Sequence, residues 1–382
     1  MRVLFVTHSA AMQGANLALL ELAQELKTHY GVEPVVLIPR IHKNYSGHNL
    51  LLACRESRIE CYSFPFYRFQ STTRWVQYVR CYSNLLFYPY IYLKFRKQHF
   101  DIIHSNGSVL SLGAFLSRLM KCPHVWHLRE AGALHYGTKS LPGKWYEKWV
   151  YTHGDVFIAI SQALKSYYSS IIPSDKIKLV YDGVRIPTTC PATKHDNMVF
   201  QFCMVGLVSG PKNQLDALKA ISVLVNEWQM TNLHFTVIGF LEPDYYQTLQ
   251  SFVHDKGLDD YVTFLGERTD VGDLLTGMDV GLILSKFEAF GRVTVEYMMH
   301  GLPVIASDTG ANPEIVEDGI TGLLCKLGNV QELASHMRTL MTDREKLLRF
   351  SANGRERAFR CFSVDQNVQQ IYETYESVLA SE

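Results

Sequence analysis

Residues 279–310 read DVGLILSKFEAFGRVTVEYMMHGLPVIASDTG, and their order of apolar and polar segments decides the fold. A short apolar run, DVGLILS, leads into a loop, KFEAFG, and then into a helical segment, RVTVEYMMHG. Gly301 and Pro303 end that helix before a second apolar run, PVIAS. A strand, a helix and another strand form the repeating unit of a parallel sheet covered by helices. The stretch therefore predicts an α/β fold.

The same alternation runs through the whole chain. In the first half, apolar runs such as VLFV, PVVLIP and DVFIAIS alternate with helical patterns such as NLALLELAQELKTHYG. The polar segment TTCPATKHDN at 188–197 interrupts this order, which then restarts with VFQFCMVG. We therefore predict two doubly wound domains, 1–185 and 186–363, joined by a linker near 186–197. We expect a terminal helix at about 364–382 to pack on the first domain.

The bulk composition fits such a two-domain protein and excludes several classes. The 382 residues contain 37 Lys and Arg and 37 Asp and Glu, so no charge excess points to nucleic acid as a partner. The eight cysteines show no metal-binding spacing, which favours buried reduced thiols. The first apolar run is too short for a signal peptide, and no run is long enough to span a membrane. We therefore expect a cytoplasmic protein that is not integral to the membrane.

The loops that follow strands are the places where a doubly wound sheet binds ligands. After VFQFCMV, Gly206 ends the strand, and Lys212 and Asn213 open a helix just beyond Gly210-Pro211. A lysine beside glycines at a helix start suits an anion, although a solvated lysine beside a helix cap is the alternative. In the opening stretch, Glu288 is expected on the loop and Glu296 about one turn into the helix.

Two loops of the first half are less specific. The loop after VLFV carries Gly14 before a helix, but it lacks the Gly-x-Gly-x-x-Gly pattern of nicotinamide dehydrogenases. His127 ends the apolar run HVWHL, where it fits either a site residue or a buried core histidine.

The combination of these motifs resembles glycosyltransferase family 4, a group of retaining nucleotide-sugar transferases with the GT-B fold. FEAFGRVTVE matches the Glu-x7-Glu motif of that family, and GLPVIASDTGANPEIVEDGITGLL matches the pattern that follows it. VGLVSGPKNQLDALKA, AISQALKSYY and LVYDGV also match. The resemblance covers nearly the whole chain, and its specific motifs lie in the C-terminal half.

The resemblance implies a cleft between two Rossmann-like domains, the first binding the acceptor and the second the nucleotide-sugar donor. It implies that Glu296 accepts hydrogen bonds from the ribose, that Glu288 and His127 lie near the donor sugar, and that Lys212 neutralises the diphosphate. Gly14 would let its loop approach the phosphate. The remaining implied donor-binding positions are Gly206, Asn213, the Gly266–Arg268 segment, and the amides of Phe290, Gly291, Arg292 and Val293.

One position departs from the family pattern. Leu207 stands where the family often has an arginine that helps to neutralise the diphosphate, and Arg129 or Arg292 is a candidate replacement. No Asp-x-Asp motif follows a strand, so we expect no metal or other cofactor. We expect UDP or GDP as the donor nucleotide.

The resulting prediction is a retaining transferase. It would move a sugar to a glycan or lipid-linked saccharide in bacterial surface polysaccharide synthesis. A nucleotide-sugar epimerase is disfavoured by the Glu-x7-Glu motif. A catalytically weak or inactive carbohydrate- or nucleotide-binding protein is the alternative that Leu207 motivates.

Residues 61–100 form a second unusual feature. They contain no Asp or Glu, six Lys or Arg, and fourteen Phe, Trp or Tyr. A basic and aromatic surface suits anionic headgroups at a membrane interface. The segment therefore predicts either a peripheral contact with the inner face of the cell membrane or a helical region whose aromatic side chains pack into the core.

Overall fold

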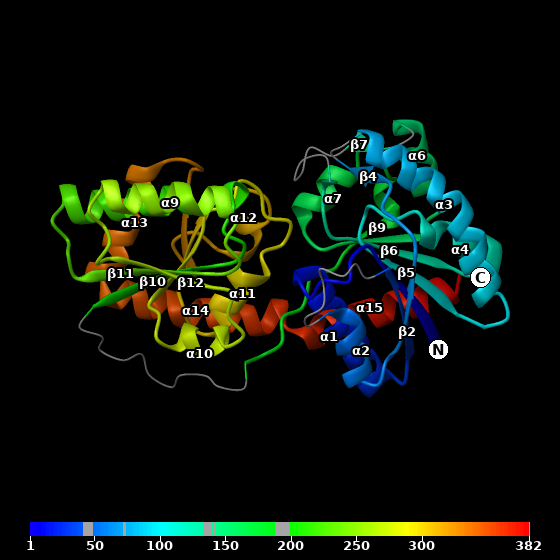
Figure 1. Ribbon diagram of the computed structural model, residues 1–382. Coiled ribbons are helices and arrows are strands. Elements are labelled where there is room, and N and C mark those ends of the chain that lie inside the picture. Colours follow the sequence, from blue (N-terminus) through cyan, green and yellow to red (C-terminus); the bar gives the residue numbers. More distant parts are fainter. Residues whose placement is uncertain (41–48, 72–73, 133–138, 141–142, 188–198, 382) are drawn as a thin grey trace. The chain divides into compact units, whose positions relative to one another are not determined.

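The computed structural model describes residues 1–40, 49–71, 74–132, 139–140, 143–187 and 199–381 (Figure 1). The chain divides into two compact units. Unit 1 comprises Met1–Gly183 and Val364–Glu382, and unit 2 comprises Val184–Ser363. Most of the linker expected near 186–197 lies outside the described residues. Within those residues, no helix combines the length and apolar character that crossing a bilayer requires.

Unit 1 is built on a seven-stranded parallel sheet with the order β3-β2-β1-β5-β6-β8-β9. Its strands are β1 (Arg2–Thr7), β2 (Glu33–Pro39), β3 (Glu60–Phe64), β5 (Ile102–Asn106), β6 (His124–Leu128), β8 (Val156–Ala159) and β9 (Ile177–Leu179). A separate antiparallel pair is formed by β4 (Gln70–Ser71) and β7 (Lys139–Ser140).

Helices cover both faces of the sheet of unit 1. One apolar cluster joins the sheet to α1 (Gly14–Tyr30), α2 (Leu50–Glu56) and the terminal helix α15 (Val364–Leu379). Another joins the opposite face to α3 (Arg74–Phe95) and α4 (Leu112–Met120). The shorter helices are α6 (Lys144–Tyr151), α7 (Gln162–Tyr168) and a 3₁₀ turn at Ser174–Lys176. Because both faces are covered, the strands are apolar almost throughout.

Unit 2 is built on a six-stranded parallel sheet with the order β12-β11-β10-β13-β14-β15. The strands are β10 (Phe200–Val205), β11 (Leu233–Ile238), β12 (Val262–Gly266), β13 (Val280–Ile283), β14 (Val304–Ser307) and β15 (Gly322–Cys325). The helices are α8 (Gln214–Ser222), continued by a π-helical turn at Val223–Glu227, α9 (Pro243–Asp255), α10 (Val271–Thr276), α11 (Arg292–Met299), α12 (Asn312–Ile315), α13 (Val330–Thr342) and α14 (Arg344–Phe362).

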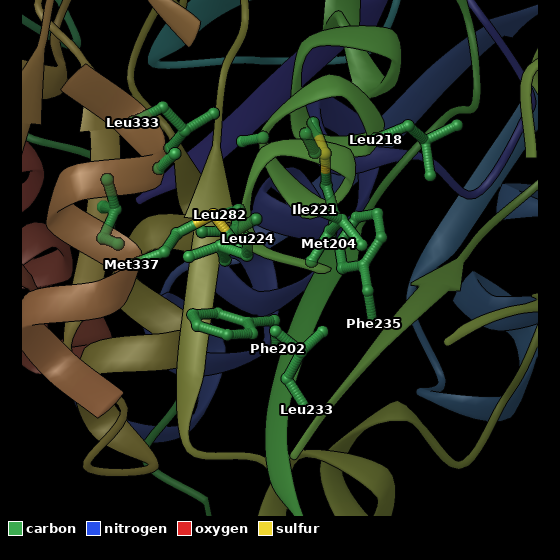
Figure 2. Packing of buried hydrophobic residues seen from close by; sticks show 14 of the residues in the cluster. Phe202, Met204, Leu218, Ile221, Leu224, Leu233, Phe235, Leu282, Leu333 and Met337 are labelled. Carbon is green, nitrogen blue, oxygen red and sulfur yellow. The ribbon is translucent and has the colours of Figure 1, made fainter. Parts of the chain in front are cut away.

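The core of unit 2 lies where α8 and α13 pack against the central strands. Phe202 and Met204 of β10, Phe235 of β11 and Leu282 of β13 meet side chains from both helices, as Figure 2 shows. Residues 279–310 form β13, α11 and β14, so the predicted α/β fold is confirmed.

Both sheets reverse their strand order at one place. In unit 1 the reversal lies between β1 and β5, and in unit 2 between β10 and β13. Loops on either side of such a point diverge to opposite faces of the sheet and leave a crevice at the carboxyl ends of the strands. The loops after β10 and β13 are therefore the first place to look for a ligand site in unit 2.

Candidate functional site

The loop after β10 brings a lysine to the point of strand reversal in unit 2. Gly206 follows the strand with a φ of 136°, which favours glycine. A 3₁₀ turn at Gly210–Lys212 then leads through Asn213, which has a φ of 63°, into α8. Asn213 Nδ2 donates a hydrogen bond to Asp216 Oδ2 at 2.7 Å, which fixes this tight entry to the helix.

The loop after β13 holds a glutamate against that lysine. Lys212 Nζ lies 2.8 Å from Glu288 Oε2 and 3.0 Å from Oε1, so both carboxylate oxygens accept hydrogen bonds. The backbone N–H of Lys286 also donates to the Pro211 carbonyl at 2.9 Å and joins the two loops. The side chains of Lys212 and Glu288 are 35% and 17% exposed. The pair is therefore fixed in position but still reachable from solvent.

Gly310 secures Glu288 from the other side. The Ala311 N–H donates to the Glu288 carbonyl at 2.8 Å, and a Cβ on Gly310 would lie only 2.2 Å from that same oxygen. Gly310 also has a φ of 58°. Gly310 ends the motif GLPVIASDTG, but the motif does not reveal its role, because its contact with Glu288 exists only in the folded chain.

The N-terminus of α11 lies just beyond the Glu288 loop. Gly291 precedes the helix with a φ of 98°, and the first amides of a helix have no partner within it. These N–H groups and the helix dipole favour an anion or an oxygen-rich ligand. Thr294, in the first turn, is buried, and its Oγ1 has no hydrogen-bond partner among the described residues. Sequence reasoning missed Thr294.

The other predicted positions on α11 divide into backbone and side-chain candidates. Phe290 is buried and packs edge-on against Phe362, so only its backbone is available to a ligand. Arg292 and Val293 begin the helix and are half-buried. Glu296 lies one turn into α11 and is half-buried, while Glu288 lies on the preceding loop. The predicted loop and helix positions of the two glutamates are therefore confirmed.

The ends of β11 and β12 lie beside the end of β10. Gly239 follows β11, and a Cβ there would lie 1.9 Å from the Gly206 carbonyl oxygen. The Gly239 N–H donates to the Gly266 carbonyl at 2.8 Å, which ties this corner to β12. Leu207, at the position of the absent arginine, is 47% exposed. This corner thus presents backbone and an apolar side chain where the family pattern has a cation.

Arg268 is bound to its own neighbour. Its Nε and Nη2 donate to the two carboxylate oxygens of Asp270 at 2.8 and 2.6 Å. The hydrogen bonds and charge of Asp270 raise the pKa of the Arg268 guanidinium. A ligand at this corner would meet Arg268 as half of an ion pair.

In unit 1, the loop between β1 and α1 is held by Asn16. Its Oδ1 accepts a hydrogen bond from the Thr7 hydroxyl at 2.7 Å, and its Nδ2 donates to the carbonyls of Ser9 and Ala11 at 2.9 and 2.7 Å. Gly14 opens α1 and is exposed beside this loop. Asn16 is a second positioning residue that sequence reasoning missed.

His127 lies in β6, as predicted, and belongs to a buried hydrogen-bonded chain. Tyr375 Oη of α15 lies 2.6 Å from His104 Nδ1, and His104 Nε2 lies 3.2 Å from His127 Nδ1. Arg129 Nη2, which can only donate, is also 3.5 Å from His127 Nδ1. His127 Nδ1 is thus the acceptor, and the proton belongs on Nε2, which has no partner among the described residues.

His104 and His127 are both neutral at pH 7. Burial lowers the pKa of His127 and of His104 well below the ordinary value, and the nearby Arg129 charge lowers both further. A neutral His127 with its proton on Nε2 can donate one hydrogen bond to an uncharged oxygen.

Arg129 forms a buried ion pair within unit 1. Its Nη1 donates to Asp182 Oδ2 at 2.7 Å, its Nε donates to Asn106 Oδ1, and the two charged side chains are only 3% and 4% exposed. The hypothesis that Arg129 replaces the cation absent at Leu207 is therefore not supported.

The described residues show no grouping of three or more His, Cys, Asp or Glu side chains able to hold a metal ion. The cysteines in this part of the chain are free thiols, several of them buried. Cys190 lies outside it.

Two family models match the chain in succession. Glycosyltransferase Family 4 matches residues 13–186, and Glycosyl transferases group 1 matches residues 188–357. An uncharacterized glycosyltransferase of Methanocaldococcus jannaschii is 26% identical over 282 residues, which cover 73% of this chain and 76% of the relative. The UDP-Gal:alpha-D-GlcNAc-diphosphoundecaprenol alpha-1,3-galactosyltransferase of Escherichia coli is 24% identical over 310 residues, covering 75% and 77%.

Solved structures show the same fold. HepE of Anabaena in complex with UDP superposes with a TM-score of 0.81 at 23% identity, over 99% of this chain and 100% of that one. Its complex with UDP-glucose gives a TM-score of 0.79 with the same identity and coverage. The predicted GT-B fold of two Rossmann-like units is confirmed. Because the two family models follow each other over residues 13–186 and 188–357, the chain belongs to the glycosyltransferases, with a family 4 domain followed by a group 1 domain.

Proposed function

We propose that this protein transfers a sugar, with retention of its anomeric configuration, from a UDP-sugar to a saccharide or lipid-linked saccharide. The acceptor would belong to bacterial surface polysaccharide synthesis. The observation that carries the proposal is the accessible Lys212–Glu288 pair beside the N-terminus of α11. Two similarities support the donor and acceptor classes. The E. coli relative is named for UDP-galactose and a diphosphoundecaprenol-linked acceptor, and HepE has been solved with UDP and UDP-glucose.

The chemistry of the leaving group explains why this pair suits the reaction. A nucleoside diphosphate departs with negative charge while the transferred sugar becomes positively charged. Fixed donors aimed at that developing charge are the largest single source of rate in many enzymes. Lys212 and the amides of Gly291 and Val293 are donors of this kind on fixed elements.

Glu288 has two successive roles in this proposal. Without a donor it neutralises Lys212. When the diphosphate binds, its phosphate oxygens neutralise Lys212 in place of Glu288. The Glu288 carboxylate then becomes available to the donor sugar. Glu296 binds the ribose, the loop of Gly14 receives the phosphate, and Nε2 of His127 donates a hydrogen bond to the sugar. No carboxylate acts as a general base, and the departing phosphate assists attack from the same face.

The test is an activity screen with UDP-, GDP- and ADP-sugars, alone and with lipid-linked saccharide acceptors. We expect slow hydrolysis of a UDP-sugar without acceptor, faster turnover with acceptor, and a product whose anomeric configuration matches the donor by NMR. An inverted product would reject retention. Nucleotide binding without any turnover would instead favour the carbohydrate- or nucleotide-binding alternative that Leu207 motivates.

Turnover in the presence of EDTA tests the metal-free part of the proposal. If Lys212 and the α11 amides supply the charge stabilisation, chelation leaves the rate unchanged. A loss of activity that Mg²⁺ or Mn²⁺ restores would show that a metal supplies it.

A further inference from the structure

Helix α3 of unit 1 has two apolar faces, although it packs on the sheet with only one. Its inner face places Tyr88, Ile91 and Phe95 in a buried cluster with Phe66. The sequence hypothesis that aromatic side chains of 61–100 pack into the core is therefore correct for this face. The outer face is also apolar, and its side chains are in solvent.

The exposed residues form a continuous stripe. Nine of the 22 exposed large hydrophobic residues in the described part of the chain lie on α3, which sets this helix apart from every other. Trp75 is 81% exposed and Leu86 75% exposed. The stripe comprises Trp75, Val79, Tyr82, Leu86, Tyr90 and Leu93. Their spacing of three, four or seven residues keeps them on one side of the 22-residue helix, along roughly 27 Å of its axis.

Helix α6 extends this face with two tryptophans. Helix α3 contacts β4 and helix α6 contacts β7, and these two strands pair with each other, which brings the two helices into the same region of unit 1 (Figure 1). Trp145 of α6 is 66% exposed, and Trp149 is also exposed. Helix α4 contacts α3, and its Leu119 is a further exposed apolar residue. We call α3 with these neighbours the aromatic face.

The charges around the aromatic face are mainly positive. Its exposed cations are Lys94, Arg96, Lys97, Arg118, Lys121, Lys144 and Lys148. Residues 61–100 contain no acidic residue in a chain whose Lys and Arg equal its Asp and Glu, so charge is separated locally. Two acids flank this segment: Glu60 is exposed but pairs with Arg2, and Asp101 is only partly exposed. Glu147 of α6 is also only partly exposed.

We propose that the aromatic face docks on a bilayer containing anionic lipid, with α3 lying in the plane of the interface. Trp and Tyr prefer the headgroup level of a membrane, and an amphipathic helix buries its apolar side about 5–10 Å deep there. Each Lys or Arg near an anionic surface contributes about 1 kcal/mol, roughly a fivefold gain in binding. A second copy of the chain is the less suitable occupant, because a symmetric dimer through this face would bring its cations together.

The test is sedimentation of the purified full-length protein with vesicles. We expect binding to phosphatidylcholine vesicles containing phosphatidylglycerol, weak binding to pure phosphatidylcholine, and release at high salt. Trp75→Ser, Val79→Ser and Leu86→Ser together should lower binding about tenfold or more. Lys94→Glu, Arg96→Glu and Lys97→Glu together should lower it by about a hundredfold.

Matched changes in unit 2 control for altered hydropathy and charge. Ile320→Ser, Leu327→Ser and Leu348→Ser remove three exposed apolar side chains elsewhere, and Lys256→Glu, Lys326→Glu and Arg349→Glu reverse three exposed cations. Neither control set should change vesicle binding. Equal sedimentation with and without anionic lipid, or equal losses in test and control variants, would overturn the proposal. So would a dimer in solution that the α3 serine variants dissociate, if the protein does not bind vesicles.

Discussion

The two sheets each reverse their strand order at one point, but they place charge differently at the carboxyl ends of their strands. In unit 1, Arg129 and Asp182 form an ion pair that is almost fully buried beside neutral histidines. In unit 2, Lys212 and Glu288 form a pair that solvent can reach beside a helix N-terminus. A buried pair has no other partner available, whereas an accessible pair can exchange one partner for a ligand. The same scaffold thus uses one pair to hold its structure and offers the other for binding.

Breaking the buried pair should have the largest effect on folding. Asp182→Asn leaves the Arg129 guanidinium buried without its counter-charge, and we expect the free energy of unfolding to fall by about 3–5 kcal/mol. Asp270→Asn breaks the exposed pair with Arg268 in unit 2 and is the matched control, with no measurable change expected. Urea denaturation of both variants measures the difference. Equal stabilities would contradict the structural role of the Arg129–Asp182 pair.

The second largest expected difference between the two units is their stability in acid. Burial lowers the pKa of His8, His104, His124 and His127, that of His124 to about 3, and all four lie in unit 1. Their unfolded pKa is about 6.5, so below that pH the unfolded chain binds more protons than the folded chain. The four histidines therefore do not reduce the free energy of unfolding above about pH 6.5. Below that pH the free energy of unfolding falls, by up to about 1.4 kcal/mol per pH unit for each histidine.

Hydrogen exchange read by mass spectrometry between pH 8 and pH 4 follows each unit separately. After correction for intrinsic exchange rates, unit 1 should lose protection at a higher pH than unit 2. Loss of protection at the same pH in both units would show that these histidines do not govern acid unfolding.

The folded molecule confirms most of what local sequence patterns predicted. Strand and helix periods, the Glu-x7-Glu spacing and the glycines near Lys212 act within a few residues, so the βαβ units and the positions of Glu288 and Glu296 followed from them. Contacts between distant segments could not be predicted in this way. Tyr375 meets His104 across 271 positions, and Gly310 meets Glu288 through a close approach that depends on packing. The outer face of α3 was ambiguous for the same reason, because aromatic composition does not say which side faces the sheet.

Tyr375→Phe tests whether the buried chain positions His127. The change removes the hydrogen bond to His104 Nδ1, and we expect stability to fall by about 1–3 kcal/mol. If the hydrogen bonds from Tyr375 through His104 fix the tautomer of His127, kcat also falls up to about tenfold while the KM for the UDP-sugar stays constant. Tyr372→Phe, on the same helix beside Tyr30, is the control and should change neither. A loss of stability with unchanged kcat would limit Tyr375 to a structural role.

Leu207→Arg should have the smallest effect of these changes, and we expect it to raise activity. Leu207 is exposed at the end of β10, so an arginine fits there without displacing the core. A second cation near the leaving diphosphate should raise kcat/KM by up to about tenfold. Leu207→Lys is a useful comparison, because lysine adds the charge without the planar fork of arginine. No gain from either variant would show that the present site does not lack charge.

The most direct test of the account is a calorimetric titration of UDP into the wild-type protein, Lys212→Ala and Lys219→Ala. Lys219 is the matched control, because it also forms an ion pair with an acidic residue, Asp216 on the same helix. The account predicts that UDP binds the wild-type and Lys219→Ala proteins equally and binds Lys212→Ala about tenfold or more weakly. Equal UDP affinity in all three proteins would contradict the claim that Lys212 receives the diphosphate.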